Sequence, residues 1–205
     1  MEAPGPLRAV RSWEEVGPDH SADDAVLETM LLTCGELGYA KATVREVCER
    51  ARIAPDRFHR RFGGKEACFA RAYEAAANRL AAQVLDACEE AAGWREGFRA
   101  GLAVLLRTVA EQPLLAKALL LEVRAARGEA WTVHQEVVER LTAALDSARH
   151  EPGARAGASA MTAGFVAGAI EESLSIELAS GRADGAELLL DDLGHLAFLQ
   201  LFGEE

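Results

Sequence analysis

The chain has 205 residues and a net charge of −11, with 50% hydrophobic and 27% charged residues. No apolar run is long enough for a membrane span, and the start lacks the apolar stretch of a signal peptide, so we expect a cytoplasmic globular protein. Aromatic residues make up only 6%, helix-favouring Ala, Leu, Glu and Arg dominate, and β-branched runs are missing, which together predict an all-α fold.

The first twenty residues lack helical periodicity. Residues 1–20 are rich in Pro and Gly, and Arg8 and Arg11 are their only basic residues. We interpret this segment as a flexible N-terminal arm. Such arms can enter a DNA minor groove, although more of them are simple disordered tails.

Three helices are expected next. The first spans about 21–38, with a Ser before it and a Gly at its end. Thr43 can cap the second helix, and Glu46 three residues later completes a capping box. Pro55 suits the first turn of the third helix, which ends near Phe62. Two short helices joined by a tight turn are the pattern of a helix-turn-helix.

The rest of the chain keeps helical periodicity. Gly and Pro residues divide it into helices at about 65–91, 94–111, 113–126, 129–149, 154–180 and 185–202. The sequence therefore predicts about nine helices, with a three-helix head near the N-terminus and a helical-bundle body behind it.

The charge is unevenly distributed. Residues 41–71 hold four acidic residues and nine basic ones, which gives +5 and leaves −16 for the remainder. Such segregation indicates a local site for a polyanion. The basic residues are Lys41, Arg45, Arg50, Arg52, Arg57, Arg60, Arg61, Lys65 and Arg71.

Residues 26–73 also carry a specific set of motifs. These are Gly38-Tyr39 at the end of the first helix, Thr43-Val44-Arg45-Glu46-Val47 at the start of the second, Phe58-His59-Arg60-Arg61-Phe62 in the third, and Gly64-Lys65-Glu66-Ala67 at the start of the fourth. In motif and spacing this segment resembles the DNA-binding head of the TetR family of bacterial transcriptional regulators. The resemblance implies a flexible arm at 1–20, a helix-turn-helix DNA-binding domain at 21–67, and a ligand-binding and dimerisation domain at 68–205.

Three residues depart from the family pattern. Arg52 stands where a turn Gly is usual, and it either adopts a left-handed backbone or forms another turn. Ala54 replaces a frequent Ser or Thr, which removes one hydroxyl for a phosphate. Asp56 places a negative charge beside DNA, which costs affinity unless it caps the helix or reads a cytosine amino group.

The basic third helix suggests how a head of this kind would bind duplex DNA. Arg57 is our candidate for a base contact, because arginine pairs bidentately with guanine. By resemblance, His59 contacts the DNA backbone, and Thr43, Arg45 and Lys65 match family positions that contact phosphate. The full set of expected DNA-binding residues is Thr43, Arg45, Ala54, Pro55, Arg57, His59, Arg60 and Lys65.

The body is expected to form a homodimer and to hold a small-molecule effector. By resemblance, the last two helices would pair with their counterparts, so that two heads face a near-palindromic operator. Candidate interface residues are Gly164, Gly168, Leu189, Leu193 and Leu196. Candidate pocket residues are Trp94, Phe98, Leu102, Trp131, His134 and Phe165, although residues of these types are more often ordinary core.

Other functions find less support in the sequence. Catalytic motifs are missing and the histidines are dispersed, so we do not expect an enzyme. The four scattered cysteines form no CxxC pair, and we expect neither a metal site nor a cofactor. We therefore expect a repressor that a ligand releases from its operator, and an activator is also compatible with the sequence. The alternative is a TetR-fold dimer that has lost DNA binding and acts through protein or ligand contacts.

Overall fold

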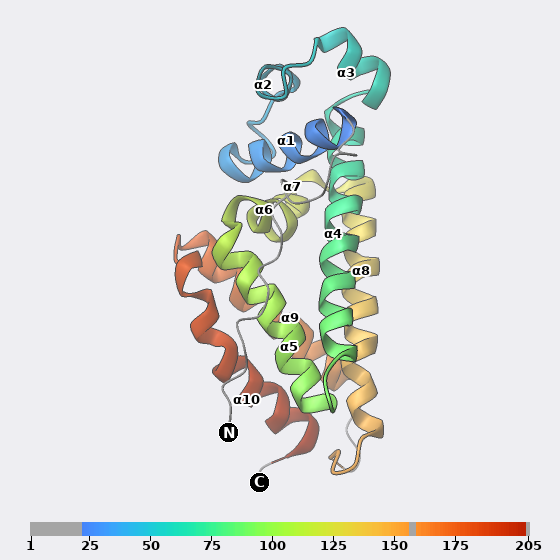
Figure 1. Ribbon diagram of the computed structural model, residues 1–205, viewed down its shortest axis with the longest axis vertical. Helices are drawn as coiled ribbons and strands as arrows, with labels where there is room; N and C mark the ends of the chain where they lie inside the picture. The colour runs from blue at the N-terminus through green and yellow to red at the C-terminus, as the bar shows by residue number, and fades with distance from the viewer. Residues whose placement is uncertain (1–21, 156–158, 204–205) are drawn as a thin grey trace.

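The computed structural model describes residues 22–155 and 159–203, and within these ranges the ordered elements are all helical. Figure 1 shows a small head, formed by α1 to α3, on one end of an elongated body. The expected arm at residues 1–20 lies outside the described residues.

The head contains α1 (Ala22–Leu37), α2 (Val44–Arg50) and α3 (Pro55–Phe62). The predicted capping box is present at the start of α2. The Thr43 hydroxyl accepts a hydrogen bond from the backbone N–H of Glu46, and the Glu46 carboxylate accepts one from the backbone N–H of Thr43. Between α2 and α3, Arg52 has a φ of 52°. The turn therefore keeps a left-handed backbone even though Arg stands in place of Gly.

The body begins with α4 (Lys65–Glu89), which runs directly out of the head. The next helices are α5 (Trp94–Glu111), α8 (Gly128–Asp146), α9 (Ala160–Ala179) and α10 (Leu189–Phe202). Helices α4 and α8 lie side by side along the length of the body (Figure 1).

Four predicted body helices differ in detail from those observed. The predicted helix at 113–126 is interrupted, because α6 (Pro113–Lys117) and α7 (Val123–Ala126) are separated by a π-helical turn, η2 (Ala118–Glu122). The predicted helix at 129–149 ends in a 3₁₀ helix, η3 (Ser147–His150). The predicted helix at 185–202 begins with another, η4 (Ala183–Leu188). Helix α9 begins at Ala160 rather than near 154, where Ser159 caps it by accepting a hydrogen bond from the N–H of Met161.

The protein has two hydrophobic cores. The first is centred on the head and extends into the body, because Phe58 and Phe69 of the head and upper α4 belong to the same buried cluster as Leu119 and Val123. The second lies in the lower body, where α5, α9, η4 and α10 contribute Leu102, Leu106, Leu178 and other apolar side chains.

The cysteines are packed into these helices as small apolar residues. Cys34, Cys48 and Cys68 are buried and Cys88 is partly buried. Burial raises the pKa of Cys34 and of Cys68 to about 12, so both thiols stay protonated near neutral pH. Separately, the described part of the chain contains no helix long and apolar enough to cross a membrane.

Candidate DNA-binding surface and ligand cavity

Helix α3 is anchored from one side. Phe58 and Phe62, four residues apart, are both buried, with ring centroids 5.2 Å apart. Arg57, His59 and Arg60 lie on the exposed remainder of the helix. The buried aromatic pair thus fixes a short helix whose outer surface is basic.

Some of the arginines in the head are already paired with acidic side chains. Arg61 binds Asp23 of α1, and Arg50 binds Glu36. Arg57 and Arg60, in contrast, form no ion pair within residues 22–155 and 159–203. These two guanidinium groups are available to an external anion, since they need not break an existing pair.

The beginning of α3 lacks a side-chain cap. Ala54 occupies the N-cap position in an extended conformation, and Pro55 follows at the first helical position. Asp56 is exposed in the first turn, where its charge favours the positive end of the helix dipole. Asp56 therefore helps to stabilise α3 through the helix dipole, but its side chain does not cap the helix.

The remaining expected DNA contacts also have structural roles. The Thr43 hydroxyl lies 2.7 Å from Glu46 Oε2, and these hydrogen bonds lower the pKa of Glu46. Arg45 is exposed and lies 3.8 Å from Glu49. The Lys65 ammonium donates to the carbonyl of Tyr39 and lies 4.1 Å from the centroid of the Tyr39 ring. Lys65 thus fixes the loop before α2 as well as adding positive charge.

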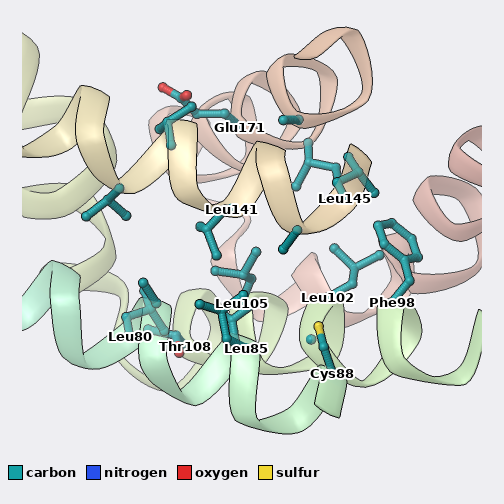
Figure 2. Close-up of a pocket in the computed structure, with 18 of the residues that line it drawn as sticks. Leu80, Leu85, Cys88, Phe98, Leu102, Leu105, Thr108, Leu141, Leu145 and Glu171 are labelled. Carbon is teal, nitrogen blue, oxygen red and sulfur yellow. The ribbon is translucent and has the colours of Figure 1, made fainter. Parts of the chain in front are cut away.

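A second feature is a cavity of about 520 Å³ inside the body. It lies between α4, α5, α8 and α9, and Figure 2 shows Leu105 and Leu141 approaching one another across it from α5 and α8. Its wall on α4 extends from Tyr73 to Glu89, a span of roughly 24 Å at 1.5 Å per residue. The cavity is therefore elongated along the body, and its wall is mainly aliphatic.

The end of the cavity nearest the head carries a connected set of polar groups. The Tyr73 hydroxyl lies 2.8 Å from His134 Nδ1, and His134 Nε2 lies 3.5 Å from a Glu171 oxygen. Arg124 donates to the same carboxylate at 2.8 Å. Burial raises the pKa of Tyr73, so its hydroxyl keeps its proton, and the carbonyl oxygen of Leu119 lies within hydrogen-bond distance of it at 3.3 Å. The hydrogen bond from His134, assisted by Arg124, lowers the pKa of Glu171 against the opposing effect of burial.

Four of the six candidate pocket residues line the cavity and two do not. Trp94, Phe98, Leu102 and His134 line the cavity. Trp131 does not line it, because it stacks on His134 at 4.8 Å and packs against the head-side core. Phe165 is 80% exposed on α9 and faces away from the cavity.

Sequence reasoning missed several wall residues. Tyr73 and Thr108 are buried in the cavity wall but give no periodicity signal that separates a wall position from ordinary core. Thr108 bonds within its own helix, to the carbonyl of Val104 at 2.9 Å. Glu171 also lines the cavity, whereas Glu122 lies outside the wall and accepts a hydrogen bond from the backbone N–H of Tyr39 at 2.6 Å.

Comparison with known proteins agrees with this geometry. Residues 34–72, which include α2, α3 and the start of α4, match the family described as "Bacterial regulatory proteins, tetR family". The matched segment contains the helix-turn-helix formed by α2 and α3, and it is similar to the DNA-binding region of TetR-family regulators. No curated protein sequence gives a significant match.

Solved TetR-fold structures cover nearly the whole chain. The fatty acid degradation regulator FadR from Bacillus halodurans is 17% identical, with a TM-score of 0.75 over 85% of this chain and 96% of that one. FadR from Bacillus subtilis, solved in complex with stearoyl-CoA, is 16% identical, with a TM-score of 0.76 over 88% and 98%. A TetR-family regulator from Marinobacter aquaeolei VT8 is 17% identical, with a TM-score of 0.70 over 89% and 96%. At these identities the likeness concerns the fold.

The last helices of the chain carry an exposed apolar surface. Among the described residues, the large hydrophobic side chains that are exposed all lie on α9, η4 or α10, and they are Met161, Phe165, Ile176, Leu188 and Leu196. Gly164 and Gly168 are exposed on α9, and a Cβ added at either would meet no atom within 4 Å. Leu193 is buried in the lower core, and Leu189 packs against that core.

Proposed function

We propose that this protein is a homodimeric repressor that binds a near-palindromic operator and is released from it by a small molecule. The observation that carries the DNA-binding part is the outer surface of α3. Arg57 and Arg60 are exposed there without an ion pair in the described part of the chain, on a helix held by Phe58 and Phe62. A protruding basic helix of this kind suits the major groove.

The two arginines would have different roles. Arg57, in the first half of α3, is our candidate for reading a guanine edge, because the N-terminal residues of a recognition helix contact the bases. Arg60 and His59 would contact phosphates together with Thr43, Arg45 and Lys65. Phosphate contacts fix the position of the head on DNA, and base contacts give the sequence preference.

The exposed surface of α9 and α10 supports dimerisation. Met161 is 78% exposed, Phe165 80% and Leu188 83%, and a concentration of large apolar side chains in water favours association. Gly164 and Gly168 would allow a second helix to approach α9 closely. We propose that the two copies of α9 and α10 form a four-helix bundle and so set the spacing of the two heads.

A ligand in the cavity could act on the head through the π-helical turn η2. Leu119 and Leu120 of this turn line the cavity, and Glu122 at its end binds the backbone N–H of Tyr39 in the head. The Tyr73 hydroxyl also lies 3.3 Å from the carbonyl oxygen of Leu119. A ligand that displaces this wall would therefore bias the position of the head, and release follows if the ligand binds the non-operator arrangement more tightly.

The stearoyl-CoA complex of Bacillus subtilis FadR gives one chemical precedent for such a ligand. Its long hydrocarbon chain agrees with the elongated, mainly aliphatic cavity in this protein. We take from that precedent only the proposal that the effector contains an extended apolar part.

The first test measures DNA binding directly. Fluorescence anisotropy is recorded with duplexes that tile the DNA beside the gene, at two salt concentrations and with random-sequence competitor DNA. We expect tight, competitor-resistant binding to one near-palindromic duplex, weakened by salt because phosphate contacts release counterions. Only weak binding that disappears at the higher salt, followed by failure to select a site from random DNA, would support the alternative of a TetR-fold dimer without DNA binding.

A double substitution tests the recognition helix. Arg57→Ala with Arg60→Ala should weaken operator binding by roughly 10²-fold, since a base contact and a phosphate contact are both lost. Arg140→Ala, which removes an exposed arginine from α8, should leave binding unchanged. If the double variant binds like the wild type, α3 does not read the operator.

A further inference from the structure

The charged residues in the wall of the body cavity are all acidic. The wall includes three glutamates, Glu89, Glu151 and Glu171, and no Lys or Arg among the described residues. The rest of the wall is dominated by Leu, Val, Ala and Ile side chains. Because an anion transferred into such surroundings loses its hydration without gaining a cation, the wall itself opposes anionic ligands.

The polar groups at the end near the head do not reverse this preference. Arg124, which lies outside the wall, is 2.8 Å from Glu171 and 3.8 Å from Glu172. One guanidinium group thus serves two carboxylates, and a carboxylate on the ligand would compete with both. His134 uses both ring nitrogens, one toward Tyr73 and one toward Glu171.

Three hydroxyl groups in the wall can still accept a hydrogen bond. Each donates its proton to a backbone carbonyl, Tyr73 to that of Leu119, Thr108 to that of Val104 and Ser147 to that of Ala144. Each hydroxyl oxygen retains acceptor capacity. A ligand hydroxyl can donate to such an oxygen, whereas an ionised carboxylate has no proton to donate.

The opposite end of the cavity is also acidic. Glu89 and Glu151 are exposed residues of the wall, so they lie where the cavity meets solvent. The N-terminus of α5, at Gly93 and Trp94, forms part of the same end and would otherwise attract an anion. Glu96 in the first turn of α5 places its carboxylate beside Gly93, so this positive end already has an anionic partner.

We infer that the cavity binds an elongated, mainly hydrocarbon molecule that is uncharged and carries a hydrogen-bond donor such as a hydroxyl group, and that it rejects fatty-acid anions and acyl-CoA thioesters. This inference rests on the proposed ligand-responsive function and specifies the class of its effector. Both ends of the cavity disfavour an anionic group, so the cavity should prefer an uncharged ligand whichever way round the ligand binds.

The test compares three molecules with the same chain: dodecanol, dodecanoate and dodecanoyl-CoA. Binding to the purified full-length protein is measured by calorimetry without DNA, at a pH where dodecanoate is ionised. We expect dodecanol to bind roughly tenfold or more tightly than either anion, because like charges facing one another disfavour binding. Equal or tighter binding of dodecanoate or dodecanoyl-CoA would overturn the inference.

Two sets of variants test whether dodecanol binds inside the cavity and whether the wall glutamates disfavour anions. Leu141→Trp should fill the middle of the cavity and abolish dodecanol binding, whereas Ala143→Trp on the exposed side of α8 should not. Glu89→Lys with Glu151→Lys should raise the affinity for both anions several-fold and leave dodecanol unchanged. Glu136→Lys with Glu139→Lys makes the same change in net charge outside the wall, and an equal gain there would overturn the role of the two wall glutamates.

Operator binding is measured separately on the same preparations. If the operator binds but none of the three molecules does, the ligand inference fails and the DNA-binding function stands. If dodecanol binds selectively but no operator is found, the inference about the cavity stands and the proposed repressor function fails.

Discussion

Arg52 occupies the turn between α2 and α3, and its φ of 52° places a side chain in a backbone region that favours glycine. We expect Arg52→Gly to raise the free energy of unfolding by about 0.5–1 kcal/mol, because the left-handed strain exceeds the added entropy of the unfolded chain. The change is measured by urea denaturation.

Arg52→Ala serves as the matched control for that substitution. It removes the same charge but keeps a Cβ at positive φ, so it should give no such gain in stability. A glycine variant no more stable than the alanine variant would show that the turn is unstrained.

Glu171 should make stability depend on pH in the acidic range. Its pKa is lowered from 4.5 by the hydrogen bond from His134 and by Arg124. A group whose pKa is lower in the folded state contributes its stabilisation above its unfolded pKa and loses it as the pH falls through the folded value. The free energy of unfolding of the wild type should therefore fall more steeply below about pH 4.5 than that of Glu171→Gln.

The measurement is a series of urea denaturation curves from neutral to acidic pH. Glu139→Gln, at an exposed position on the neighbouring helix α8, should retain the steep wild-type profile. Parallel profiles for the wild type and Glu171→Gln would mean that the hydrogen bond from His134 does not favour the ionised carboxylate.

At the scale of elements, α1 packs closely on α6 at Gly35. A Cβ added there would lie 2.0 Å from the carbonyl oxygen of Leu114, a backbone atom that cannot move without its helix. Gly35→Ala gains about 1 kcal/mol in helix propensity, but overpacking costs typically 1–3 kcal/mol. Because the added Cβ meets a backbone atom, the cost should lie in the upper half of that range, and we expect a net loss of roughly 1–2 kcal/mol, measured by thermal or urea unfolding.

Gly185→Ala provides the comparison for this contact. An added Cβ at Gly185 meets no atom within 4 Å, so this variant should be as stable as the wild type or slightly more stable. Equal stability of both alanine variants would show that α1 can move away from α6 at little cost.

The elements most accurately predicted are those with local signals. Thr43 and Glu46 identify the start of α2, and Pro55 identifies the start of α3, because each signal acts within one turn of the helix it defines. The π-helical turn at Ala118–Glu122 has no comparable signal. It depends on contacts with α1, α4 and α9, which are distant in sequence.

The cavity shows why a residue's place can be harder to predict than its burial. Trp131 and His134 are three residues apart on α8 and share a face, yet only His134 reaches the cavity wall. Phe165 lies on a helix with apolar residues around its whole circumference, so periodicity cannot tell whether it faces inward or outward. Such distinctions require the positions of the neighbouring helices.

At the scale of the whole molecule, we predict that the exposed surface of α9 and α10 determines the oligomeric state. Phe165→Glu should convert a dimer to a monomer, because it places a charge at the centre of an apolar interface. Light scattering coupled to size-exclusion chromatography measures the mass. Operator affinity should fall by roughly 10²-fold or more, since two linked heads bind far more tightly than one.

The matched variant is Ala143→Glu, which adds the same charge to an exposed position on α8. It should remain dimeric and bind the operator normally. A dimeric Phe165→Glu variant would place the interface on another surface.

The core shared by head and body limits how this regulator can be recombined with others. Met30 and Phe58 in the head are buried in one cluster with Leu115, Leu119 and Val123, which lie far beyond residue 67 in the sequence. In a chimera joined after residue 67, the head of another regulator would have to pack against body leucines whose positions fit the side chains of this head. Engineers who wish to transplant its DNA specificity into a biosensor should therefore move α6, η2 and α7 together with the head, or redesign the apolar contacts between them.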